Sequence, residues 1–112
     1  MNIQIFGIKK CFDTKKAERY FKERKIKYQF IDLTLKGLSK GELQSVKSSI
    51  GLNDLINNEA KDFKKLNLHK ITTPSIREEL LLSNPSLYKT PIVRNGKQAT
   101  LGYQPEIWKA WE

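Results

Sequence analysis

The sequence predicts a mixed α/β fold, organised as one domain over residues 1–112 around a four-stranded mixed sheet. Three observations predict it. Strand and helix patterns alternate at the start of the chain, a run of helix signals fills about residues 38–83, and a hairpin signal followed by a short helix pattern closes the sequence. The middle run is then a helical insertion between a βαβ half and a ββα half.

The first half of the pattern is a strand, a helix and a second strand. Ile3 and Ile5 alternate with polar residues until Gly7, which is typical of a strand. Residues 12–24 carry apolar side chains at spacings of three and four and predict a helix, and residues 28–32 predict the next strand. The two strands should be parallel, with a right-handed crossover between them.

The middle of the chain predicts three helices. Ser39 followed by Glu42 has the form of a capping box, which opens a helix that stops near Gly51. Residues 54–66 predict a second helix, and residues 74–82 predict a third with a proline in its first turn.

The last quarter predicts a hairpin and a helix. Asn95-Gly96 lies between two apolar segments, which indicates a two-residue type I′ turn. Pro105 precedes apolar residues at helical spacing up to Trp111. The whole order matches a thioredoxin-like core with a helical insertion, a match that concerns the fold and not the activity.

Composition narrows the classes of partner. The 21 Lys and Arg outnumber the 12 Asp and Glu, and the formal net charge of +9 favours an anionic partner. The basic residues are interspersed with acids and form no nucleic-acid recognition motif, so we do not expect direct nucleic-acid binding. No apolar run approaches the roughly 20 residues of a bilayer span. The N-terminus also lacks a secretory-signal pattern, so we expect a cytosolic protein with no membrane association.

Cys11 is the candidate nucleophile. It is the single cysteine beside a single histidine, which excludes an internal disulfide and an ordinary structural zinc site. Cys11 lies between the first strand and the first helix, where free N–H groups and the helix dipole stabilise a thiolate. Lys10 and Lys15 add positive charge close to it in the sequence. The alternative for a lone cysteine is inert packing, and His69 is interpreted as a surface residue.

The segments FGIKKCFDTKKAERYF, IDLTLKGLSKGEL, GLNDLINNEAKDFKKLNL and NPSLYKTPIVRNGKQATLGYQPEIW resemble the arsenate reductase (ArsC)/Spx family in order and spacing. The resemblance implies a thioredoxin-like fold with Cys11 as nucleophile. It also implies that Thr90 and Pro91 shape the thiol-substrate groove, with Pro91 in a cis peptide bond as in other thioredoxin-like folds. The single cysteine looks closest to small members of the family that are glutathione-dependent thiol reductases.

The resemblance therefore implies a thiol-dependent reductase, whose partners are a small thiol or an oxidised protein substrate. Glutathione is the expected cosubstrate, with no bound cofactor and no metal. The residues assigned to the substrate are Lys10, Lys15, Thr90, Pro91 and Tyr103. The arginines that hold arsenate in this family are matched here by Glu59 or a neighbour, by Thr90 and by Tyr103. Neutral hydroxyls cannot replace a bidentate guanidinium, so we expect little arsenate reduction.

The alternative is an Spx-like, redox-responsive transcription regulator. Gly51 matches a glycine that such regulators use against the RNA polymerase α subunit, and Gly102-Tyr103 also looks Spx-like. These regulators commonly carry a second cysteine three residues after the first, where this chain has Thr14. An internal disulfide switch is therefore excluded, and the two functions stay open at this point.

Overall fold

Strands and helices alternate as the sequence predicts in the two halves of the sheet, and the computed structural model describes all 112 residues. The elements of the first half are β1 (Ile3–Gly7), α1 (Phe12–Glu23) and β2 (Tyr28–Asp32). The insertion holds α2 (Lys40–Ile50), α3 (Leu52–Leu55), α4 (Lys61–Lys65), α5 (Pro74–Ser83) and the short 3₁₀ helix η1 (Pro85–Leu87). The chain ends with β3 (Ile92–Asn95), β4 (Gln98–Leu101) and α6 (Pro105–Trp111).

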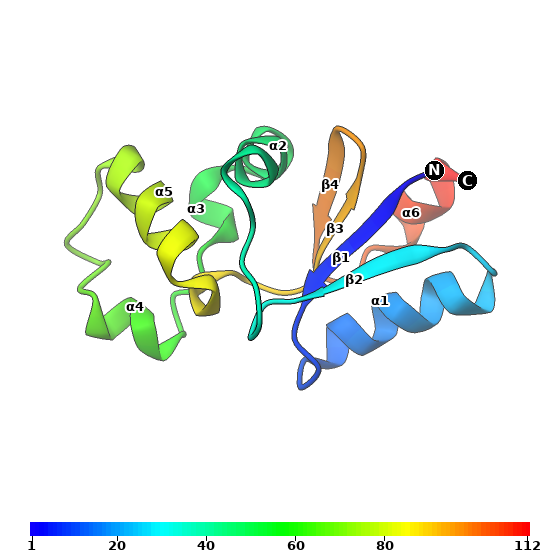
Figure 1. Cartoon of the computed structure of the whole chain (residues 1–112), viewed down its shortest axis with the longest axis horizontal. Helices are drawn as coiled ribbons and strands as arrows, with labels where there is room; N and C mark the ends of the chain where they lie inside the picture. Colours follow the sequence, from blue (N-terminus) through cyan, green and yellow to red (C-terminus); the bar gives the residue numbers. More distant parts are fainter.

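The four strands form one sheet in the order β2-β1-β3-β4. β1 and β2 are parallel, with Ile5 opposite Phe30, and the β1–β3 and β3–β4 pairs are antiparallel. In Figure 1 α1 and α6 lie on one side of this sheet, whereas α2 to α5 extend away from it on the other side. The predicted mixed sheet and the insertion between its halves are confirmed.

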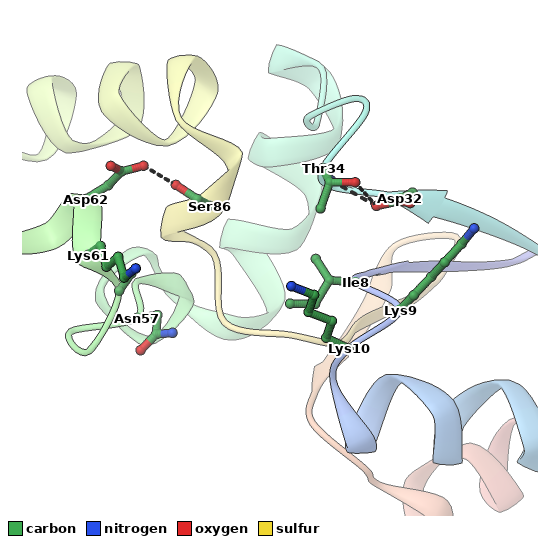
Figure 2. Close-up of a pocket in the computed structure, with 10 residues that line it drawn as sticks. Ile8, Lys9, Lys10, Asp32, Thr34, Asn57, Lys61, Asp62 and Ser86 are labelled. Carbon is green, nitrogen blue, oxygen red and sulfur yellow. Dashed lines mark hydrogen bonds between the residues drawn. The ribbon is translucent and has the colours of Figure 1, made fainter.

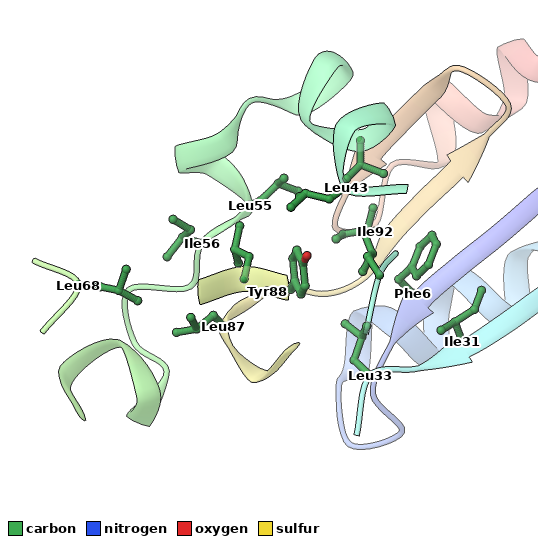
Figure 3. Packing of buried hydrophobic residues seen from close by; sticks show 13 residues of the cluster. Phe6, Ile31, Leu33, Leu43, Leu55, Ile56, Leu68, Leu87, Tyr88 and Ile92 are labelled. Atoms are coloured by element: carbon green, nitrogen blue, oxygen red, sulfur yellow. The ribbon is translucent and has the colours of Figure 1, made fainter. Parts of the chain in front are cut away.

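Alternation along the strands divides the core into two clusters. Ile3 and Ile5 face α1 and α6, where they meet Phe21 and Trp108. Phe6 faces the insertion, because successive side chains of a strand point to opposite faces. Figure 3 shows this second cluster running from Phe6 and Ile92 through Tyr88 and Leu87 to Leu68. One continuous set of apolar contacts therefore ties the insertion to the sheet.

The predicted helix over residues 54–66 is wrong. α3 ends at Leu55, Ile56 forms an antiparallel bridge with Tyr88, and α4 begins only at Lys61. The Asn57 N–H donates to the Leu87 carbonyl at 2.7 Å, and the Lys89 N–H donates to the Leu55 carbonyl at 2.8 Å. These non-local bonds hold residues 55–57 beside the chain that leads into β3, and the chain then turns, with the Ala60 N–H donating to the Asn57 carbonyl at 3.1 Å.

The hairpin is present, but its turn is displaced by one residue from the prediction. Asn95 stays in β3 and pairs with Gln98, so the turn residues are Gly96 and Lys97. Gly96 has φ of +60° and Lys97 has no positive φ, which fits a type II′ turn with glycine first rather than a type I′ turn.

No helix of the chain has the length and apolar character needed to cross a bilayer.

Candidate active site

Cys11 is the N-cap residue of α1, at the end of the loop that follows β1. Its own N–H donates to the Ile8 carbonyl at 3.1 Å, and its carbonyl accepts the Lys15 N–H at 3.2 Å. The side chain makes no capping bond to the helix and is partly exposed. The local turn and the first bond of α1 therefore fix the backbone of Cys11 while the sulfur remains available.

The surroundings of the Cys11 sulfur favour its thiolate. Partial burial raises the pKa of the thiol. Hydrogen bonds that a thiolate would accept, from the side chains of Thr14 and Thr90 and then from the N–H groups of Thr14 and Asp13, lower the pKa and prevail. The thiol itself donates to the Thr90 carbonyl, with 3.7 Å between Sγ and O. The pKa of Cys11 is consequently below its ordinary value, as predicted, and hydrogen bonding is the cause rather than the flanking lysines.

Thr14 is the most unusual of these neighbours. It is completely buried, and its Oγ1 has no hydrogen-bond partner. A Cβ placed on Gly7 would lie only 2.6 Å from the Thr14 side chain, so the glycine at the end of β1 makes the space that Thr14 occupies. A buried hydroxyl without a partner is costly. A thiolate on Cys11 would give that hydroxyl an acceptor.

Cys11 opens into a cleft of about 620 Å³ between the sheet and the insertion. The lining residues are Cys11, Asn57, Asn58, Glu59, Lys89, Thr90, Leu101 and Gly102. The Thr90–Pro91 peptide bond is cis, as the resemblance implied. The Thr90 N–H has no partner within the chain, and the Thr90 carbonyl lies 3.7 Å from the Cys11 sulfur.

Two of the predicted substrate residues lie outside this cleft on the solvent side. Lys10 is exposed and lines a neighbouring hollow. Lys15 is exposed on α1, where its Nζ lies 5.8 Å from the centre of the Phe12 ring. Neither lysine is among the groups that shift the pKa of Cys11.

Tyr103 is also outside the cleft lining. Its ring packs edge-on against Trp108 with 5.6 Å between ring centroids. The Lys16 Nζ lies 5.6 Å from the centre of the Tyr103 ring. Arg94 points away from Cys11, because its Nη1 donates to the Gln4 Oε1 at 2.7 Å and its Nε donates to the Gly96 carbonyl at 3.0 Å. His69 is exposed in the insertion.

Gly51 lies between α2 and α3, far along the chain from Cys11. It is half-exposed with φ of +105°, a conformation that only glycine adopts readily. This explains why the helix stops there, as predicted, independently of any partner.

Sequence reasoning missed two features of the site. Thr14 could have been found from its position, since the third residue of a helix commonly faces the N-cap side chain. Asn57 reaches the cleft because residues 55–57 are bonded to the chain before β3. No local signal in the sequence indicates that pairing.

The family of the chain follows from comparison with known proteins. The model of the ArsC family matches residues 6–111. The chain belongs to the ArsC family. The fold of this ArsC-family protein is therefore thioredoxin-like, as its topology predicted.

Individual relatives carry different names. Global transcriptional regulator Spx 2 of Oceanobacillus iheyensis is 31% identical over 109 residues, which cover 95% of this chain and 80% of that protein. The solved structure of the YFFB (PA3664) protein is 28% identical, with a TM-score of 0.82 and 96% of each chain covered. An arsenate reductase from Vibrio cholerae superposes with a TM-score of 0.84 over 96% of this chain and 94% of its own, but at 22% identity that likeness concerns the fold alone.

Proposed function

We propose that the protein is a glutathione-linked thiol reductase of the cytosol, with Cys11 as its nucleophile. The observation that carries this proposal is the setting of the Cys11 sulfur, at the N-terminus of α1 beside the buried Thr14 hydroxyl and open to a cleft. A thiolate is the attacking form in thiol–disulfide exchange. The unpaired Thr90 N–H and the Thr90 carbonyl suit an extended peptide such as glutathione.

The reaction needs no second cysteine. The Cys11 thiolate attacks the glutathione sulfur of a glutathionylated substrate, forms a Cys11–glutathione disulfide and releases the substrate as its thiolate. A second glutathione thiolate then attacks that disulfide, which releases oxidised glutathione and regenerates the Cys11 thiolate. The incoming glutathione sulfur is thereby oxidised from thiolate to disulfide, and the substrate sulfur is reduced from disulfide to thiolate, so the exchange balances. A single cysteine is therefore sufficient for turnover.

Trapping of the mixed disulfide tests the proposal. Incubation with oxidised glutathione should add the mass of one glutathionyl group to the protein, and reduced glutathione should remove it. Because Cys11 is the single cysteine, the Cys11→Ser variant is a complete control and should gain no mass. If the protein gains no mass after incubation with oxidised glutathione, the proposed reductase function is wrong.

The regulator is the second candidate, because the relative with 31% identity is called a global transcriptional regulator. In this alternative the half-exposed surface around Gly51 binds the RNA polymerase α subunit. A pull-down with the C-terminal domain of that subunit distinguishes the two functions. A complex at micromolar concentration that survives the Cys11→Ser change supports the regulator, and no complex in low salt excludes it.

Arsenate is not the expected substrate. The cleft carries Lys89, Thr90 and Glu59 but no arginine, and Tyr103 packs on Trp108 outside it. A single flexible ammonium attracts an oxyanion but does not hold it in line with the sulfur. We expect arsenate turnover near background in a coupled assay with glutathione and glutaredoxin, and an increase in the Thr90→Arg/Tyr103→Arg double variant. Robust turnover by the unmodified protein, abolished by Cys11→Ser, would contradict this assignment.

A further inference from the structure

A second and larger hollow, of about 720 Å³, lies beside the Cys11 cleft. It is lined by Ile8, Lys9, Lys10, Asp32, Thr34, Asn57, Ala60, Lys61, Asp62 and Ser86. Asn57 lines both spaces, and Lys10 directly precedes Cys11 in the chain. The hollow and the cleft therefore adjoin each other on the two sides of the reactive loop.

The positive groups of the hollow are free to bind a ligand. The chain forms two ion pairs, Arg24–Glu112 and Lys47–Glu78, so none of the hollow's lysines is paired. Figure 2 shows Lys10 and Lys61 on facing sides of the space, whereas Lys9 points away from it. The loop after β1 supplies one ammonium and α4 supplies the other.

The acidic groups of the hollow are engaged within the protein. Asp32 Oδ1 accepts both the N–H and the hydroxyl of Thr34, at 2.9 and 2.7 Å, and Asp62 Oδ2 accepts the Ser86 hydroxyl. Those bonds from Thr34, together with the charge of Lys9, lower the pKa of Asp32. Lys9 and Asp32 thus offset each other at one edge, and the lining as a whole has one positive charge in excess.

Asn57 adds a neutral donor at the boundary with the cleft. Its Oδ1 accepts the Glu59 N–H at 3.0 Å, which leaves the side-chain amide N–H groups directed elsewhere and without a partner. Ile8 and Ala60 supply the apolar part of the lining. Apolar contact beside a few convergent donors is typical of a site for a small molecule.

We propose that this hollow binds the carboxylate-bearing half of the disulfide that Cys11 attacks, with Lys10 and Lys61 as its main cationic contacts. The inference rests on the proposed reductase function and adds a substrate class, namely disulfides with a carboxylate close to the sulfur. One half of the substrate lies along Thr90 in the cleft and the other extends past Asn57 into the hollow. Cys11 then attacks the sulfur that joins the two halves.

A matched pair of substrates tests the site. Dithiodiglycolate carries a carboxylate on each half, and hydroxyethyl disulfide is its neutral counterpart. Mass spectrometry measures the rate at which each disulfide forms a mixed disulfide with Cys11. The fraction of Cys11 present as thiolate affects both rates equally, so it drops out of the ratio of the dithiodiglycolate rate to the hydroxyethyl disulfide rate. Each of Lys10→Gln and Lys61→Gln should lower this ratio about threefold at low salt, and the double variant about tenfold.

The control is Lys15→Gln, because Lys15 is exposed on α1 and lines neither space. It should leave the ratio unchanged, and the differences among variants should vanish near 1 M salt, where the screening length is about 3 Å. An equal loss in Lys15→Gln, or no loss in the double variant, would overturn the site.

Alkylation separates this inference from the reductase function. Iodoacetate and iodoacetamide both react with a thiolate, and only the first is anionic. If neither disulfide reacts with Cys11, the reductase proposal fails, and the alkylation ratio then decides the inference alone. A ratio of iodoacetate to iodoacetamide rates that falls in Lys10→Gln but not in Lys15→Gln supports the site, and equal ratios refute it.

Discussion

A Trp108→Ala variant is expected to lose about 3–5 kcal/mol of unfolding free energy, the usual loss for a buried tryptophan. Trp108 is completely buried, and its rings pack 5.2 Å from both Tyr20 and Phe21. Its Nε1 also donates to the Thr100 Oγ1 at 2.8 Å, so the change leaves a cavity and a hydroxyl with one bond fewer. Urea unfolding followed by circular dichroism measures the loss.

Trp111 provides the matched control on the same helix. It is only partly buried at the edge of the same cluster, so Trp111→Ala should cost clearly less than Trp108→Ala. Equal losses of unfolding free energy in the two variants would mean that Trp111, at the end of α6, holds the helix to the sheet as strongly as Trp108 does. A negligible loss for Trp108→Ala would contradict the packing of α6 against α1.

A Thr14→Val variant is expected to raise the pKa of Cys11, which lowers the thiolate fraction and therefore the alkylation rate near neutral pH. The two side chains are nearly isosteric, and Thr14 is buried without a partner for its hydroxyl. Valine therefore keeps the packing against Gly7 and removes the hydroxyl that would donate to a Cys11 thiolate. The measurement is the rate of iodoacetamide alkylation as a function of pH.

Two further variants separate this hydrogen bond from general effects of substitution. Thr14→Ser keeps a hydroxyl and should restore most of the lowered pKa. Thr100→Val removes a buried hydroxyl that bonds Trp108 and is not among the groups that shift the pKa of Cys11, and it should leave the titration of Cys11 unchanged. A Thr14→Val protein that titrates like the parent would show that the Thr14 hydroxyl does not support the thiolate.

Local patterns predicted those parts of the fold whose hydrogen bonds are local. The capping box at Ser39 and Glu42 forms reciprocally, with bonds of 3.2 and 2.8 Å, because both partners lie within one turn of α2. The proline at the start of α5 likewise stands in its first turn. Ala17, Tyr20 and Phe21 form the buried stripe of α1. In each case neighbours in the sequence decide the conformation.

Non-local contacts explain the failures. Ile56 leaves the predicted helix because it pairs with Tyr88, more than thirty residues later. Arg77 then ties the insertion together through side-chain bonds to the carbonyls of Ile71 and Leu68, at 2.6 and 3.0 Å. Such pairings depend on the packed tertiary structure and leave no periodic signal. The wall of the Cys11 cleft that contains Asn57 follows from them.

The candidate site was predictable in its nucleophile and not in its supporting groups. The position of Cys11 before a helix predicted a stabilised thiolate, and the structure attributes it to Thr14 and Thr90. Lys10 and Lys15 seemed equivalent in the sequence because both are close to Cys11 along the chain. Helix geometry directs Lys15 to the outer surface, whereas Lys10 lies on the loop and lines the hollow.

Titration of the Cys11 thiol tests the central claim most directly. Thiolate absorbance in the ultraviolet, measured on the parent against Cys11→Ser, gives the pKa of this one group without interference from another cysteine. The hydrogen bonds around the sulfur predict a pKa clearly below the value of about 8.5 for an unperturbed cysteine. A pKa at or above that value would contradict an activated thiolate and leave Cys11 as a packing residue.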